Sequence, residues 1–160
     1  MIPSRIIWHH SAINKDGDQL KQIDAYHKQR DFPLSKRGYY VGYHYLIERS
    51  GLVTQCRDLD EIGAHDQGEN LNSIGICLAG DFTAMLPNEA QTKTAATIVA
   101  EIRAAYFIPI NRIEPHRWDD NTQCPGAFLP DNWLVKKYLE YEGSPILRAV
   151  YWLCEAAKLL

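Results

Sequence analysis

One continuous apolar run, from Ser73 to Gly80, constrains the fold of this chain more than any other feature. It contains Ile74, Ile76, Cys77 and Leu78 and shows no alternation between apolar and polar residues. Such a run is typical of a strand buried on both faces, as found at the centre of sheets that helices cover. We therefore expect a fold built around this segment as a central strand.

Further strands and helices flank this segment, and their patterns predict a mixed sheet. Short β-rich runs predict strands at residues 5–9, 40–48, 52–57 and 112–114. Apolar residues spaced three or four apart predict helices at residues 18–30, 88–106, 131–141 and 145–160. Ser50-Gly51 predicts a turn that joins two of the strands as an antiparallel hairpin. The predicted fold class is α/β, a single domain in which helices pack on a central mixed β-sheet.

Length and charge narrow the classes of protein to which the chain can belong. With 160 residues and 46% hydrophobic composition, it can bury one core of ordinary size. A formal net charge of -3 and a pI near 6.0 supply no broad basic field for nucleic acid or an anionic membrane. We therefore expect no nucleic acid partner and no stable membrane insertion.

The N-terminus and the cysteines bear on where the protein is made. Residues Met1 to Arg5 lead straight into an apolar run, without the charged and then apolar leader of a signal peptide. The cysteines are too sparse for a disulfide scaffold; they are Cys56, Cys77, Cys124 and Cys154. We expect cytoplasmic synthesis with no signal peptide, and reduced thiols.

The last predicted helix belongs to a C-terminal segment at residues 144–160, where Ser144-Pro145 is typical of a helix start. One face of this helix carries an apolar stripe, made of Ile146, Val150, Leu153, Ala157 and Leu160. We expect the stripe to pack on the core of the same domain. The alternative is a docking surface for a second chain or a membrane face.

Several residues with metal-binding side chains predict a zinc site. His116 and Cys124 bracket a polar segment, and a loop of this length can bring an imidazole and a thiolate to one ion. A histidine at the end of the first strand would be the third ligand, leaving a fourth position for water as in catalytic sites. His9 and His10 are both candidates, but neighbours on a strand face opposite sides, so only one of them can point into the site. The pattern does not choose between them.

Four sequence blocks, in order, carry a resemblance to a known family. They are Ile7-Trp8-His9-His10-Ser11-Ala12, Val41-Gly42-Tyr43-His44-Tyr45-Leu46-Ile47, Gly63-Ala64-His65 ahead of Asn72-Ser73-Ile74-Gly75-Ile76, and His116-Arg117 with Thr122-Gln123-Cys124-Pro125-Gly126. Over residues 6–128 the chain resembles the type 2 N-acetylmuramoyl-L-alanine amidases, which include bacteriophage amidase lysozymes and animal peptidoglycan recognition proteins. The resemblance implies their α/β fold, with a zinc amidase catalytic domain at residues 1–143.

The resemblance also assigns roles to individual residues. It implies His9, His116 and Cys124 as zinc ligands, Tyr43 and Thr122 as catalytic residues, and His65 and Asn72 as substrate-binding residues. His9 is thereby favoured over His10. Thr122 departs from the lysine of some phage members, so this chain has no positive charge there. His44 points to the face opposite Tyr43, and we expect it to be structural.

The activity implied is zinc-dependent hydrolysis of the amide between N-acetylmuramic acid and L-alanine, with peptidoglycan, as muramyl peptide, for the partner. One alternative is a non-catalytic peptidoglycan-binding module, but those relatives usually lack the cysteine that stands here as Cys124. Another is a cytoplasmic wall-recycling amidase, which typically has aspartate at that position. Cys124 therefore favours a phage-type endolysin, released to act on periplasmic peptidoglycan.

Overall fold

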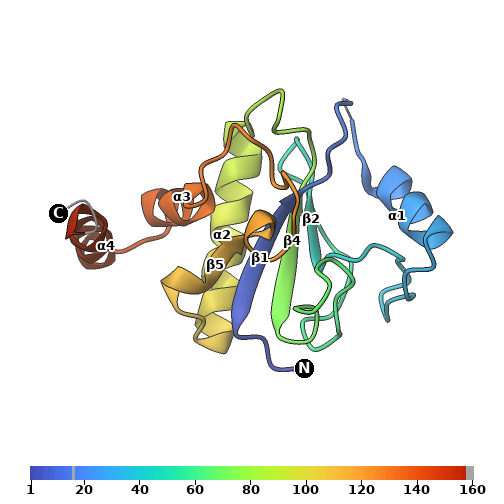
Figure 1. Cartoon of the computed structure of the whole chain (residues 1–160), viewed down its shortest axis with the longest axis horizontal. Coiled ribbons are helices and arrows are strands. Elements are labelled where there is room, and N and C mark those ends of the chain that lie inside the picture. Colours follow the sequence, from blue (N-terminus) through green and yellow to red (C-terminus); the bar gives the residue numbers. More distant parts are fainter. Residues whose placement is uncertain (16, 158–160) are drawn as a thin grey trace.

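The computed structural model describes residues 1–15 and 17–157. Within them the elements, in chain order, are β1 (Arg5–His10), α1 (Leu20–Gln29), β2 (Tyr45–Ile47), β3 (Val53–Gln55), β4 (Ser73–Leu78), α2 (Glu89–Tyr106), η1 (Ile110–Arg112), β5 (Ile113–Pro115), η2 (His116–Trp118), α3 (Trp133–Tyr141) and α4 (Pro145–Ala157). Strands and helices alternate along the chain, as the sequence predicts, and the α/β class is confirmed (Figure 1).

The five strands form one mixed sheet in the order β3-β2-β4-β1-β5. β4 lies at its centre, parallel to both β1 and β2, and every residue of β4 is buried. β5 pairs with β1 in parallel, while β2 and β3 form the predicted antiparallel hairpin. The apolar run from Ser73 is therefore the central strand that its composition indicates.

Alternation along β1 divides its side chains between two sides of the sheet. Ile6 and Trp8 belong to the larger core, where they pack with the apolar face of α2. The stripe predicted for α2 is buried there; it contains Ala95, Ile98, Val99 and Ile102. On the other side, α1 packs over β2 and β4 through Ile23, in a smaller core with Leu46 and Cys77. Figure 1 shows α1 well separated from α2, with the sheet between them.

The predicted strand at residues 40–48 is wrong over its first half, because only Tyr45–Ile47 pairs as a strand. The preceding segment makes irregular contacts instead: the Gly42 N–H donates to His27 Nδ1 at 3.0 Å, and the His44 N–H donates to the Gly75 carbonyl at 2.9 Å. A Cβ on Gly42 would lie 2.1 Å from the Ala64 carbonyl oxygen. This close approach requires glycine and prevents an ordinary ladder.

The remaining predicted elements are present with changed bounds: β1 extends one residue further than predicted, β5 is shifted by one residue, and β3, α1, α2 and α3 are shorter. β3 covers only residues 53–55 of the predicted 52–57. α1 begins at Leu20 rather than at residue 18, where the Glu48 carboxylate accepts hydrogen bonds from the N–H groups of Gln19 and Leu20. A carboxylate from a neighbouring segment thus satisfies donors that a helix start leaves unpaired.

The C-terminal helix α4 does not pack with the stripe that its sequence predicts. Ile146 is 77% exposed and Leu153 is 70% exposed. The residues that contact the larger core are instead Leu147 and Tyr151, on another face. Leu160 and the rest of residues 158–160 lie outside the described residues. None of the described helices combines the length and apolarity needed to cross a bilayer.

Candidate metal centre

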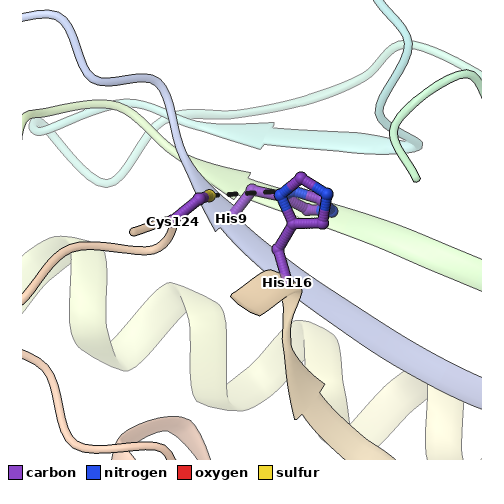
Figure 2. A group of neighbouring side chains, drawn as sticks. All are labelled: His9, His116 and Cys124. Atoms are coloured by element: carbon purple, nitrogen blue, oxygen red, sulfur yellow. Dashed lines mark hydrogen bonds between the residues drawn. The ribbon is translucent and has the colours of Figure 1, made fainter. Parts of the chain in front are cut away.

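Three chain segments meet beside the carboxyl end of β1. His9 lies near the end of that strand, and His116 directly follows β5, whose Pro115 pairs with Trp8. Cys124 comes from the loop after η2. One potential ligand atom from each of His9, His116 and Cys124 lies within 4.8 Å of the others. Figure 2 shows the three side chains pointing toward one another.

The two neighbouring histidines of β1 occupy different environments. The His10 ring lies near Phe82 of the larger core, and its Nδ1 accepts a hydrogen bond from the Phe82 N–H at 3.2 Å. The His9 side chain points into the cluster, with Nδ1 3.8 Å from the Cys124 sulfur. The sequence pattern allows either histidine as a ligand, whereas in the structure His9, and not His10, points into the cluster. His10 contributes through its backbone N–H, which lies 3.4 Å from the same sulfur.

The outer nitrogen of each clustered imidazole has its own partner. His9 Nε2 lies 3.1 Å from His65 Nδ1, and His116 Nε2 lies 3.1 Å from a carboxylate oxygen of Asp120. The inner atom, His116 Nδ1, is buried and has no hydrogen-bond partner among the described residues. A buried polar atom without a partner is costly. The arrangement therefore leaves His116 Nδ1 without a partner, beside His9 and Cys124.

In the cluster the two imidazoles have the protonation state that a cation requires, whereas the thiol would have to lose its proton. Burial, followed by the neighbouring His65 and His116, lowers the pKa of His9 well below its usual value, so its ring is neutral. Burial also lowers the pKa of His116. Burial raises the pKa of the Cys124 thiol to about 12, so a bound cation would have to favour its thiolate. Two neutral imidazoles and one cysteine that becomes a thiolate on metal binding are ligand types of catalytic zinc sites.

Tyr43 lies against the cluster, with its ring centroid 5.1 Å from that of His9. Burial raises the pKa of its phenol well above the usual value, which keeps it a neutral hydrogen-bond donor. The same side chain lines a cavity of about 560 Å³ between α1 and the loop after β1. The other lining residues are Ser11, Ile13, Gln22, Ile23, Ala25, Tyr26, His27 and Gln29. Tyr43 therefore lies between the cluster and this cavity, which His9, His116 and Cys124 do not line.

The other predicted site residues lie in three different places. The Thr122 hydroxyl accepts a hydrogen bond from the Cys124 N–H at 3.1 Å, inside the loop of residues 116–124, called the ligand loop below. His65 lies over the sheet, and a Cβ on Gly75 would come within 2.4 Å of its ring. Asn72 has an exposed side chain and precedes β4, at the opposite end of the sheet. The structure brings Thr122 and His65 to the cluster and leaves Asn72 apart.

Sequence reasoning missed two residues that support the site. The Asn70 side-chain oxygen accepts hydrogen bonds from the N–H groups of His65 and Asp66, at 2.7 and 3.0 Å. Asp120 is the partner of His116 Nε2 described above. Asp120 could have been found from its spacing, since it lies four residues after His116 in the same polar loop. Asn70 gives no comparable signal.

Comparison with known proteins places this geometry in context. The profile of the N-acetylmuramoyl-L-alanine amidase family matches residues 1–127. An endolysin of Enterobacteria phage K11 is 32% identical over 137 residues, which cover 82% of this chain and 85% of the endolysin. The human N-acetylmuramoyl-L-alanine amidase is 32% identical over 93 residues, 57% of this chain. This chain spans only 16% of the human enzyme's length.

Among solved structures, the amidase LysC from Clostridium intestinale URNW superposes with a TM-score of 0.73 at 26% identity. The match covers 88% of this chain and 87% of LysC. Wild-type PGRP-LB of Drosophila, at 24% identity and a TM-score of 0.68, shares the fold. Since the profile match covers both β1 and the ligand loop, the chain belongs to the N-acetylmuramoyl-L-alanine amidase family.

Proposed function

We propose that this chain is a zinc-dependent N-acetylmuramoyl-L-alanine amidase of the phage endolysin type. It would hydrolyse the amide between N-acetylmuramic acid and L-alanine in peptidoglycan. The observation that carries the proposal is the meeting of His9, His116 and Cys124, with an inner nitrogen of His116 buried and unpaired within the described part of the chain. Membership of the amidase family supports the reaction, and the K11 endolysin, of similar extent, supports the phage type.

The three ligands would leave one zinc coordination position for water or substrate, and zinc would there supply Lewis acidity toward the amide carbonyl. Tyr43 keeps its phenolic proton and donates a hydrogen bond to the carbonyl oxygen as negative charge develops on it. The Thr122 oxygen accepts the Cys124 N–H, so the hydroxyl proton remains available to the substrate. Because Thr122 is neutral, it contributes less charge stabilisation than a lysine would.

The cavity beside Tyr43 is the proposed site for the muramyl peptide. Its volume of about 560 Å³ suits a fragment of a few residues or sugars. His65, proposed as a substrate-binding residue, does not line this cavity and contacts His9 instead. Asn72 can meet substrate only if a long glycan strand crosses to the far end of the sheet.

Two alternatives make different predictions. A non-catalytic peptidoglycan-binding module would bind wall fragments without cleaving them, and the retained thiol and two imidazoles argue against it. A cytoplasmic wall-recycling amidase would prefer small soluble muropeptides. We favour an endolysin that is made in the cytoplasm and reaches periplasmic peptidoglycan after release.

Digestion of purified peptidoglycan tests the reaction. We expect new L-alanine amino termini, no increase in reducing sugar, and about one zinc per chain by elemental analysis. His9→Ala and Cys124→Ala should lose both zinc and activity. His10→Asn is the matched control, because its amide oxygen can still accept the Phe82 N–H and zinc should be retained. New reducing ends without new alanine termini would refute the amidase assignment.

A further inference from the structure

The two ring nitrogens of His116 are held in different states. Nε2 lies 3.1 Å from the Asp120 carboxylate, which as an anion can only accept a hydrogen bond. The proton of the neutral imidazole therefore lies on Nε2. Nδ1, buried and without a partner among the described residues, keeps its lone pair toward Cys124 and His9. Such a partner fixes both the tautomer and the orientation of a metal-binding histidine.

Asp120 is held in place by the backbone of its own loop. Its N–H donates to the His116 carbonyl at 3.3 Å, and its carbonyl accepts from the Thr122 N–H at 2.7 Å. The Thr122 hydroxyl in turn accepts the Cys124 N–H. The carboxylate that holds His116 is therefore linked through short contacts to the loop that carries Cys124.

The neighbouring Asp119 anchors this loop to β1. Its carboxylate pairs with Arg5, whose side chain is 7% exposed and also pairs with Glu69 at 2.9 Å and with Glu114. Arg5 lies on the same strand as His9, four residues earlier. Buried ion pairs with several hydrogen bonds hold a defined geometry, because breaking them leaves an uncompensated charge. β1, which carries His9, is thus tied through Arg5 and Asp119 to the residue that contacts His116.

We propose that Asp120 is a positioning residue for His116, and that the Arg5–Asp119 pair holds it in register with β1. The assignment rests on the proposed function in one respect, the role of His116 as a metal ligand. A different assignment is a second cation site made by Asp66, His116 and Asp120, which have potential ligand atoms within 4.8 Å of one another. That site would need His116 Nε2 to give up its proton, so the hydrogen bond to Asp120 favours positioning.

The first test measures the tautomer of His116 in the metal-free protein, by imidazole nitrogen chemical shifts. Wild type should show the Nε2–H form, and Asp120→Ala should show a mixture. Asp120→Asn should retain the Nε2–H form, because its amide oxygen can still accept. An unchanged tautomer in Asp120→Ala would overturn the proposal, whether or not the protein binds zinc.

The second test measures zinc affinity by competition with a chromogenic chelator. Asp120→Ala should bind about 10-fold to 100-fold more weakly than wild type, and Asp120→Asn should lie between them. Asp119→Asn should also weaken binding, and the exposed Asp60→Asn, which removes the same charge far from the site, should not. Equal affinity for wild type and Asp120→Ala would contradict the proposal. So would a second bound zinc ion that Asp66→Asn removes. Absence of zinc from wild type would instead refute the proposed function.

Discussion

Replacing Asp66 by asparagine should stabilise the metal-free protein increasingly as the pH rises. Asp66 is 2% exposed, and neither of its carboxylate oxygens has a hydrogen-bond partner among the described residues. Burial, followed by the nearby carboxylates of Asp119 and Asp120, raises the pKa of Asp66 from 3.8 to about 7. Between pH 3.8 and about 7, Asp66 therefore keeps its proton in the folded protein but has lost it in the unfolded chain.

The sign and size of the effect follow from this difference. The stability that protonated Asp66 contributes to the folded state is fully present below pH 3.8. It is lost as the pH rises through about 7, where Asp66 of the folded protein ionises. A pKa difference of roughly 3, at about 1.4 kcal/mol for each pH unit, sets an upper bound of about 4 kcal/mol at pH 8. Asparagine has nearly the same shape and stays neutral at every pH.

Urea denaturation with a chelator, at pH 4, 5, 6, 7 and 8, measures the free energy of unfolding of wild type and Asp66→Asn. The advantage of the variant should grow with pH, by at least about 1 kcal/mol between pH 5 and pH 8. Comparison at each pH cancels the titration of groups that do not interact with Asp66. Asp60→Asn controls for the loss of one negative charge. If the advantage of Asp66→Asn were the same at pH 5 and pH 8, the raised pKa would be wrong.

Three further predictions concern other parts of the molecule. Tyr43→Phe should lower kcat strongly while zinc content and folding are retained; more than about half of wild-type turnover, a change under ~0.5 kcal/mol, would remove Tyr43 from the reaction. The free energy of unfolding should fall as the pH drops from 6.5 to about 4, because burial lowers the pKa of His27 and His44 to about 4. Their Nδ1 atoms accept backbone N–H groups in the folded protein. In urea denaturation, His44→Gln should make the free energy of unfolding depend less on pH over this range. Truncation after Gly143 should lower the free energy of unfolding by about 2 kcal/mol, because Leu147 and Tyr151 are the α4 residues that pack on the core among those described. Urea unfolding measures this, and a loss above about 5 kcal/mol would show deeper packing.

Much of the sheet could be predicted because its strands and helices have local patterns. The run at β4 and the stripe on α2 are set by burial alone, so periodicity finds them. His44 is buried and structural as expected, since its Nδ1 accepts the Gly75 N–H and its Nε2 contacts the Glu61 carbonyl. The segment before β2 could not be predicted, because its partners are His27 and Ala64, which are distant in sequence.

Part of the candidate site could likewise be predicted from the sequence, and part could not. The proposed ligands could be named because they lie in blocks shared with a known family. The choice of His9 over His10 needed either that resemblance or the observed sheet. Asp120 lies outside those blocks; its spacing of four residues from His116 is the sequence signal for it, but its contact with His116 Nε2 depends on how the loop folds. The exposed face of α4 was also misjudged, because helical periodicity shows that a stripe exists but not what it meets.

The long chain separation between the clustered residues has a consequence for the unfolded protein. His9 and Cys124 are 115 residues apart, yet β1 and β5 bring their segments together. The proposed zinc ion would link these two segments, which are far apart in the sequence. Closing a loop of this length restricts the unfolded chain by about 4 to 5 kcal/mol in the simple entropy treatment used for disulfides. Chelation should therefore lower the unfolding temperature of the whole domain, including α2 and β3, rather than loosen only the loop that carries Cys124.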